Sequence, residues 1–298
     1  MIDRIITRPD FDGIVCAALL REALEPDLPI YWTQPDMVQN GRIQVTPGDI
    51  IANLPFYDGC ALWFDHHITN VIQRPYKGLY RVAPSAAGLI HEYFHVDLSP
   101  RFDTLVAQTD KIDSAQLTLD EILHPERYPC ILVSMTISTG SANDETFWNH
   151  LVELLRTSEI EQVMKDPWIQ RHCHRVVAEN KVYETHLKRR TRVQQGVSIT
   201  DFRELDPVPN GNRFLVYSLF PETFVNVKIF YEKDRTAVKI GHSIVNNNCK
   251  INVGGLLARH GGGGHRGAGA CRLNNAHADR IISEILQILI DNRPDKPN

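Results

Sequence analysis

The chain of 298 residues is 43% hydrophobic and 23% charged, which is typical of a globular protein and long enough for two domains with separate cores. Its formal net charge of −4 argues against a protein that coats long duplexes, because such binding needs many cationic contacts to phosphate. No apolar stretch of the sequence approaches the roughly 20 residues that span a bilayer, and the first residues lack the pattern of a signal peptide, so we expect a cytoplasmic protein without membrane contact.

The first part of the chain alternates strands with helices. Helical apolar spacing over 14–25 follows a turn that contains Asp10 and Asp12, and Pro84 with Ser85 marks the start of another helix. Short apolar runs predict strands at 5–6, 30–32, 49–52 and 60–64. Strands that alternate with helices in this way predict an α/β fold with a doubly wound, mostly parallel sheet.

The middle of the chain, from about 145 to 193, is predicted to be helical and strongly charged. It ends in the most basic stretch of the sequence, 188–192. We favour a solvated helix face at a domain junction for this stretch, and the alternative is a patch that steers phosphate toward an interdomain cleft. Gln195 and Gly196 would mark the end of the helix. We therefore divide the chain into a first domain with a helical connector, 1–195, and a smaller second domain, 196–298.

The second domain is predicted to be a smaller α/β unit with a glycine-rich run over 261–270. Predicted strands lie at 214–217, 225–231 and 237–240, and predicted helices lie at 253–257 and 275–290. Consecutive glycines cost conformational entropy, and without β-carbons their N–H groups can approach anionic oxygens closely. A flexible loop is the alternative explanation. We expect a cradle for phosphate or a nucleotide, formed by Gly262, Gly263, Gly264, His265 and Arg266.

Two acid-bearing turns follow predicted strands in the first domain. Asp65, His66 and His67 come directly after the apolar run 60–64, and Asp10 with Asp12 follows the first strand. Taken alone, the pair of aspartates is explained by a turn and the pair of histidines by a structural or solvated role. Ligand sites form at the carboxyl ends of parallel strands, and carboxylates with imidazoles can ligate a divalent metal. Together the two turns predict a metal site that acts on phosphate.

These motifs resemble those of the DHH phosphoesterase superfamily, which joins a DHH domain to a C-terminal DHH-associated domain. The resemblance covers nearly the whole chain and depends on residues 8–13, 65–67, 109–113 and 261–265. The superfamily includes RecJ-type exonucleases, small oligoribonucleases, cyclic dinucleotide phosphodiesterases and exopolyphosphatases. The resemblance implies an active site in the cleft between the two domains, with Mn²⁺ or Mg²⁺ activating a water molecule.

The resemblance also assigns roles to single residues. The implied metal ligands are Asp10, Asp12, Asn53, His66 and Asp110. Within 109–113 we prefer Asp110 over Asp113 because it comes soon after the apolar-spaced residues 105–107, and Asp58 is the alternative to Asn53. Of the implied catalytic residues, His67 and Arg8 would contact the scissile phosphate, and Asp65 would orient the ring of His66 or hold its loop.

Two positions depart from the superfamily pattern. Arg8 lies where a histidine is usual, and Asn53 lies where an aspartate usually bridges two metals. A guanidinium cannot ligate a metal, and an amide is a weaker ligand than a carboxylate. We therefore expect one ion rather than two, with Arg8 either neutralising phosphate oxygens or pairing with Asp10.

The expected function is metal-dependent hydrolysis of a short single-stranded oligonucleotide, a nucleotide or polyphosphate. Because of Arg8 and Asn53, a weakened or inactive regulator that binds nucleotides or nucleic acid on the same scaffold is the alternative. A purely structural partner protein would leave the glycine run unexplained. The oligomeric state is open, with a homodimer as one possibility.

Overall fold

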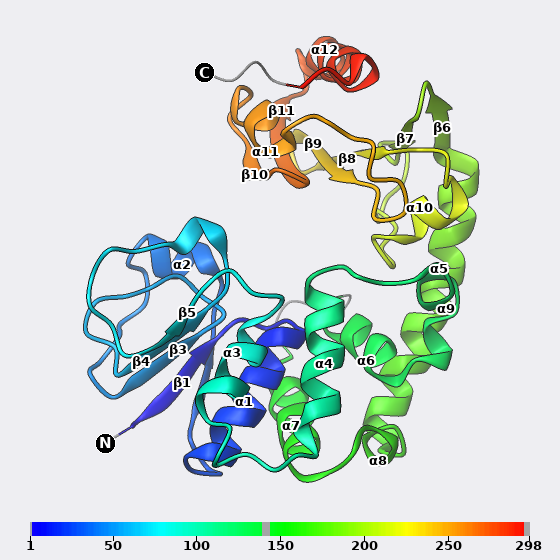
Figure 1. The fold of residues 1–298 in the computed structure, drawn as a ribbon. Coiled ribbons are helices and arrows are strands. Elements are labelled where there is room, and N and C mark those ends of the chain that lie inside the picture. Colours follow the sequence, from blue (N-terminus) through cyan, green and yellow to red (C-terminus); the bar gives the residue numbers. More distant parts are fainter. Residues whose placement is uncertain (1, 139–143, 295–298) are drawn as a thin grey trace. The chain divides into compact units, whose positions relative to one another are not determined.

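The computed structural model describes residues 2–138 and 144–294, and these form two compact units (Figure 1). The first unit comprises Met1–Leu117 and His124–Val176, and the second comprises Thr118–Leu123 and Val177–Asn298. Helix α9 (Pro167–Arg190) contributes to both units. The division between compact units thus falls inside this helix, and the predicted domains, 1–195 and 196–298, stay a prediction.

A five-stranded parallel sheet forms the first unit. Its strand order is β2-β1-β3-β4-β5, so the chain starts in the middle of the sheet and crosses over it in both directions. The strands are β1 (Arg4–Thr7), β2 (Ile30–Trp32), β3 (Asp49–Ala52), β4 (Leu62–Asp65) and β5 (Gly78–Tyr80). The prediction of an α/β fold with a parallel sheet is confirmed.

Apolar side chains cover both faces of this sheet. Ile6, Ile51 and Trp63 lie in register on adjacent strands and form a core with Val38 near the end of α2 (Pro35–Gln39). The alternate residues point to the opposite face, where α1 (Phe11–Ala23) packs against β1 and β3. Full burial on both sides explains why these strands read as continuous apolar runs in the sequence.

The other helices of the first unit form a cluster around α1 (Figure 1). α3 and α7 pack on α1, and α4 packs on both α1 and α3. These helices and their neighbours are α3 (Ala86–Tyr93), α4 (Phe102–Asp113), α6 (Pro129–Ser138), α7 (Glu145–Thr157) and α8 (Ile160–Val163). The predicted start signal at Ser85 is confirmed, because its hydroxyl accepts a hydrogen bond from the N–H of Gly88 and caps α3.

A mixed six-stranded sheet forms the second unit, in the order β10-β11-β9-β8-β7-β6. Helices α11 and α12 contribute Leu256, Leu257, Ile285 and Leu289 to its apolar core. The strands are β6 (Thr191–Gln194), β7 (Val197–Asp201), β8 (Val225–Glu232), β9 (Arg235–His242), β10 (Gly263–His265) and β11 (Ala268–Asn274). The helices are α5 (Leu119–Leu123), α10 (Leu215–Leu219), α11 (Val253–Ala258) and α12 (Ala278–Asp291).

Two local predictions are wrong. The predicted strand at 214–217 is part of the short helix α10, because a short apolar run does not distinguish a strand from a buried helical turn. Gln195 and Gly196 do not end a helix: α9 stops at Arg190, and both residues have positive φ, 47° and 81°, in the tight turn of the β6–β7 hairpin. Among the described residues no helix has the length and apolar character of a membrane span.

We expect Gly13→Ala to lower the free energy of unfolding by about 1–3 kcal/mol, because the added methyl group would overlap the carbonyl oxygen of Arg8. Gly13 is the third residue of α1, and its N–H donates to the N-cap residue Asp10. Gly255 is the matched control, since it is the third residue of α11 and its N–H donates to the N-cap residue Asn252.

A methyl group at Gly255 would find its nearest neighbour at 3.4 Å, so Gly255→Ala should leave stability unchanged or raise it by up to about 1 kcal/mol. Urea unfolding followed by circular dichroism compares the two variants. Equal unfolding midpoints would contradict the close approach inferred at Gly13.

Candidate metal centre

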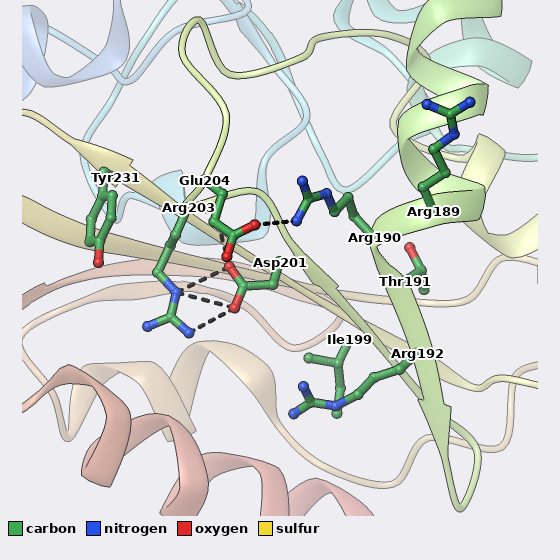
Figure 2. Close-up of a pocket in the computed structure, with 9 residues that line it drawn as sticks. All are labelled: Arg189, Arg190, Thr191, Arg192, Ile199, Asp201, Arg203, Glu204 and Tyr231. Carbon is green, nitrogen blue, oxygen red and sulfur yellow. Dashed lines mark hydrogen bonds and ion pairs between the residues drawn. The ribbon is translucent and has the colours of Figure 1, made fainter.

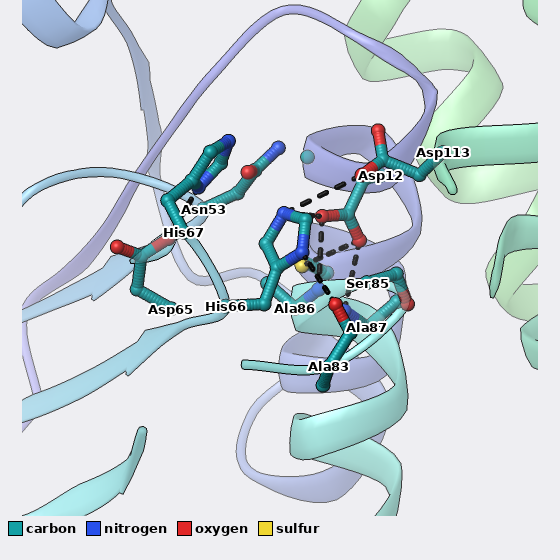
Figure 3. A network of polar contacts seen from close by, with 12 residues as sticks. Asp12, Asn53, Asp65, His66, His67, Ala83, Ser85, Ala86, Ala87 and Asp113 are labelled. Atoms are coloured by element: carbon teal, nitrogen blue, oxygen red, sulfur yellow. Dashed lines mark hydrogen bonds and ion pairs between the residues drawn. The ribbon is translucent and has the colours of Figure 1, made fainter. Parts of the chain in front are cut away.

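The candidate site lies at the carboxyl edge of the parallel sheet (Figure 3). β1, β3 and β4 are neighbours, with Thr7 opposite Ala52 and Ala52 opposite Phe64. The segments that leave these strands therefore start side by side. They carry the predicted polar residues Asp10, Asp12, Asn53, Asp65, His66 and His67.

Asp12 is a buried carboxylate with 1% of its surface exposed. From the first turn of α1 it reaches the first turn of α3, where the N–H of Ala86 donates to Oδ2 at 2.9 Å and the N–H of Ala87 donates to Oδ1 at 2.8 Å. A helix N-terminus stabilises negative charge. Burial, followed by the charge of Asp10, nevertheless raises the pKa of Asp12 to about 7. The two N–H groups alone do not compensate this buried charge.

His66 turns one ring nitrogen toward the protein backbone and the other toward two carboxylates. Nδ1 lies 3.0 Å from the carbonyl oxygen of Ala83, which can only accept a hydrogen bond, so Nδ1 carries a proton. Nε2 lies 3.7 Å from Oδ2 of Asp12 and 3.4 Å from Oδ2 of Asp113. A lone pair on Nε2 that faces two carboxylates requires a cation or a proton between them.

Helix α4 brings Asp113, rather than Asp110, to His66. The ligand atoms of Asp12, His66 and Asp113 all lie within 4.8 Å of one another. Asp110, one helical turn earlier, accepts a hydrogen bond from the hydroxyl of Ser85 at 2.5 Å and so supports the cap of α3. Burial, followed by the charge of Asp12, raises the pKa of Asp113 to about 7. The geometry thus favours the alternative that the sequence placed second, while metal binding by either residue stays a prediction.

Asp10 is occupied by contacts to three neighbours. Its Oδ1 accepts hydrogen bonds from the N–H of Gly13 and from Nδ2 of Asn53, both at 2.9 Å. Its Oδ2 lies 3.1 Å from Nε of Arg8. The predicted pairing of Arg8 with Asp10 is therefore present, and the guanidinium supplies positive charge beside this carboxylate.

Asp65 contacts the second histidine and not the first. Its Oδ1 lies 2.7 Å from Nδ1 of His67, and its Oδ2 accepts a hydrogen bond from Nδ2 of Asn70 at 2.6 Å. The expectation that Asp65 orients the ring of His66 is wrong, because the carbonyl oxygen of Ala83 holds that ring. The alternative role of Asp65, holding the loop, agrees with its contact to Asn70. Burial lowers the pKa of His67, but the hydrogen bond and charge of Asp65 outweigh it and the pKa is raised.

Two buried polar atoms of this cluster make no hydrogen bond among the described residues: Nε2 of His66 and Oδ1 of Asn53. Asn53 has a φ of 56°, and its Nδ2 is used by Asp10, which leaves Oδ1 available. A buried polar atom without a partner costs about 1–3 kcal/mol. Carboxylate, imidazole and amide atoms are donors that Mn²⁺ accepts. The residues present therefore fit a divalent cation, which Asp12, His66 and Asp113 would hold, while ligation by Asn53 stays a prediction.

The glycine run of the second unit forms an edge strand. β10 pairs with β11, with Gly263 opposite Ala270 and His265 opposite Ala268. At Gly264 the φ of 146° and the nearby carbonyl of Ala268 demand a glycine. Gly263 differs, because nothing lies within 4 Å of the position a β-carbon would take. The fold thus explains why residue 264 is a glycine but not why residue 263 is one. The open space beside Gly263 can admit a ligand.

The remaining members of the predicted cradle also have defined surroundings. Gly262 lies against β11, where a β-carbon would overlap the carbonyl oxygen of Ala270. The guanidinium of Arg266 lies 3.4 Å from the carbonyl oxygen of Lys250. Binding of substrate by the cradle, and its predicted position in an interdomain cleft, stay predictions.

The comparisons with known proteins gave matches only among solved structures. No protein-family model matches the chain. A search of curated proteins found no match.

The chain is similar to PggH from Vibrio cholerae, a pGpG-specific phosphodiesterase, with 27% identity and a TM-score of 0.85 over 98% of this chain and 100% of that chain. RecJ from Thermus thermophilus, in complex with Mn²⁺, has 14% identity and a TM-score of 0.61 over 98% of this chain and 52% of that chain. The chain belongs to the DHH phosphoesterase superfamily. The resemblance inferred from the motifs is thereby confirmed.

A third DHH-superfamily structure is an exopolyphosphatase-related protein from Bacteroides fragilis, with 12% identity and a TM-score of 0.55 over 97% of this chain and 93% of that chain. At this identity and that of RecJ, the likeness concerns the fold. The α/β fold class predicted from sequence is confirmed by the same matches.

Sequence reasoning missed the backbone groups that hold the centre. The N–H groups of Ala86 and Ala87 and the carbonyl of Ala83 orient Asp12 and His66, yet none of these three residues has a reactive side chain. The signal that could have found them is the cap at Ser85, because a helix that starts there presents its first N–H groups to a nearby anion.

We expect Asp113→Asn to weaken binding of Mn²⁺ by about tenfold or more, because it removes a charged ligand. Asp110→Asn is the matched control, with the same substitution one helical turn away, and should change the affinity by less than about threefold. Isothermal titration calorimetry measures affinity and stoichiometry, and we expect one ion per chain in the unmodified protein. A larger loss of Mn²⁺ affinity in Asp110→Asn than in Asp113→Asn would show that Asp110, and not Asp113, is the ligand.

Proposed function

We propose that this protein is a metal-dependent phosphodiesterase that hydrolyses short oligonucleotides. The observation that carries the proposal is the cluster of Asp12, His66 and Asp113, in which Asp12 and His66 are buried and both carboxylates face an imidazole nitrogen that makes no hydrogen bond among the described residues. Buried polar groups normally have hydrogen-bond partners. A buried nitrogen without one, in a member of a superfamily of phosphoesterases, fits a site for a catalytic cation.

A dinucleotide such as pGpG is the substrate we infer first. Similarity to the pGpG-specific phosphodiesterase extends over the full length of both chains, whereas the chain matches only about half of RecJ. The net charge of −4 also suits a short substrate better than a long nucleic acid, whose affinity depends on many cationic contacts. The inferred ion is Mn²⁺ or Mg²⁺, because RecJ structures contain one or the other.

A bound divalent cation would lower the pKa of a water molecule and so supply a hydroxide nucleophile at neutral pH. The chain itself positions the reacting groups. Asp12 and Asp113 contribute negative charge for the cation, and Ala83 fixes the ring of His66 with Nε2 facing both of them. Asn53 would add an amide oxygen, and its Nδ2 is held by Asp10.

His67 is inferred to bind the scissile phosphate as an imidazolium. The carboxylate of Asp65 lies 2.7 Å from Nδ1 and raises the pKa of the ring, so the proton is retained nearer to neutral pH. Nε2 is then the donor directed at a phosphate oxygen. Arg8 would add positive charge at the same edge, although its pairing with Asp10 limits its reach.

We expect Mn²⁺-dependent hydrolysis of pGpG that EDTA abolishes and that Asp12→Ala reduces by at least about 100-fold, because that variant loses a ligand and the contact to α3. A panel with a longer oligoribonucleotide, adenosine bisphosphate and polyphosphate defines the preferred length. Circular dichroism checks that the variant is folded. Tight binding of one panel member without any turnover would contradict the hydrolase and support the non-catalytic regulator.

We expect Gly263→Ala to raise the KM for the dinucleotide by about tenfold and to leave the melting temperature unchanged, because a methyl group there meets no protein atom but occupies the space left for the ligand. Gly255→Ala is the control for a glycine elsewhere in the same unit and should leave KM unchanged. An unchanged KM for Gly263→Ala would exclude this strand as the substrate cradle.

A further inference from the structure

The second unit contains a basic pocket of about 430 Å³ that the proposed function does not use (Figure 2). It is formed by the end of α9, by β6 and β7, by the segment after β7, and by Tyr231 of β8. All of these elements belong to the second unit. Part of its lining comes from the basic stretch 188–192. The sequence favours a solvated helix face for this stretch, and a patch that steers phosphate is the alternative.

Local pairing explains how the pocket forms. β6 is the edge strand of the sheet, and Arg192 lies opposite Ile199 of β7. Residues two apart on a strand share a face, so Asp201 lies on the same side as Ile199. On β8, Tyr231 continues the face of Val227 and Ile229, which belong to the apolar core, but its own side chain is 48% exposed. The pocket therefore lies where the covered face of the sheet reaches solvent.

The charges that line the pocket fall into two groups. Arg203 is fully engaged, with Nη2 2.7 Å from Oδ2 of Asp201 and Nη1 2.6 Å from Oδ1 of Asp279. Arg190 pairs with the exposed carboxylate of Glu204. Four guanidinium groups and two carboxylates line the pocket, which leaves an excess of two positive charges in a protein of net charge −4.

Arg189 and Arg192 are the two arginines that remain uncommitted. Both side chains are exposed, and neither guanidinium makes a hydrogen bond or an ion pair with another residue of the described ranges, although the charge of Arg192 helps to lower the pKa of Asp201. Across the pocket from them is the ring of Tyr231 (Figure 2). Guanidinium groups bind phosphate oxygens in pairs of hydrogen bonds, and an exposed tyrosine ring provides a stacking surface for a base. The volume is that of a small-ligand pocket.

This pocket is separate from the glycine strand. β6 and β10 are the two opposite edges of the six-stranded sheet. Five inter-strand spacings correspond to about 24 Å, so one small ligand cannot occupy both places.

We propose that this pocket is a second binding site, specific for a nucleoside phosphate, with Arg189 and Arg192 binding the phosphate and Tyr231 stacking on the base. The guanidinium groups of Arg189 and Arg192 supply the positive charge for the phosphate. Such a site would allow nucleotide levels to be sensed by the second unit.

Calorimetric titration of the Mn²⁺-loaded protein with GMP tests this site. We expect two binding events per chain in the unmodified protein and one in the double variant Arg189→Gln with Arg192→Gln. This variant spares the ion pairs of Arg190 and Arg203, so the pocket keeps its framework. Tyr231→Ala should weaken the second event by about tenfold for GMP and leave inorganic phosphate binding unchanged.

The matched control is Arg171→Gln with Arg293→Gln, which removes the same charge from two exposed arginines outside the pocket. It should retain both binding events. Retention of every binding event in the Arg189→Gln, Arg192→Gln variant, or equal loss in the control, would overturn the site, whether or not the metal centre binds GMP. Equal affinity for GMP and inorganic phosphate, or no effect of Tyr231→Ala, would overturn recognition of the nucleoside.

Discussion

The contact between the Asp12 carboxylate and the first N–H groups of α3 is the interaction on which the candidate centre depends. It joins α1, which follows the first strand, to a helix that begins more than 70 residues later in the chain. Because both oxygens accept hydrogen bonds from Ala86 and Ala87, the carboxylate has one orientation. Helix α4 packs on both α1 and α3, the two helices that this contact joins. The two N–H groups lower the pKa of the carboxyl, but burial outweighs them and the pKa stays raised, which is the condition that favours a cation.

Charge compensation at the neighbouring Asp10 is of a different kind. Arg8 and Asn53 occupy its oxygens, together with the backbone of α1. A guanidinium that cannot lose its proton gives permanent compensation, whereas the N–H groups of α3 and the nearby imidazoles only partly offset the burial of Asp12 and Asp113. The structure thus contains two adjacent acidic groups, one with a permanent positive charge beside it and one without. This difference is the physical basis for inferring one ion.

Much of the fold could be predicted from the sequence because the signals were local. The strands at 30–32 and 49–52 coincide with β2 and β3, and the cap at Ser85 starts α3. The predictions failed where a local signal has two solutions. An apolar run such as 214–217 fits a strand or a helical turn, and Gln195 with Gly196 fits a helix end or a hairpin. In both cases tertiary packing selected the other solution.

The sequence by itself determined which side chains could form the centre, because Asp10, Asp12, Asn53 and 65–67 follow strands whose carboxyl ends meet at one edge. Only the tertiary structure decided which of them meet. Asp110 and Asp113 are one helical turn apart and lie on nearly the same face of α4, so spacing alone gives no preference between them. The packing of α4 against α3 places Asp110 in a hydrogen bond with Ser85 and places Asp113 beside Nε2 of His66. Likewise, the loop after β4 turns His67, and not His66, toward Asp65, because a contact between neighbours in sequence depends on the backbone conformation that the surrounding fold imposes.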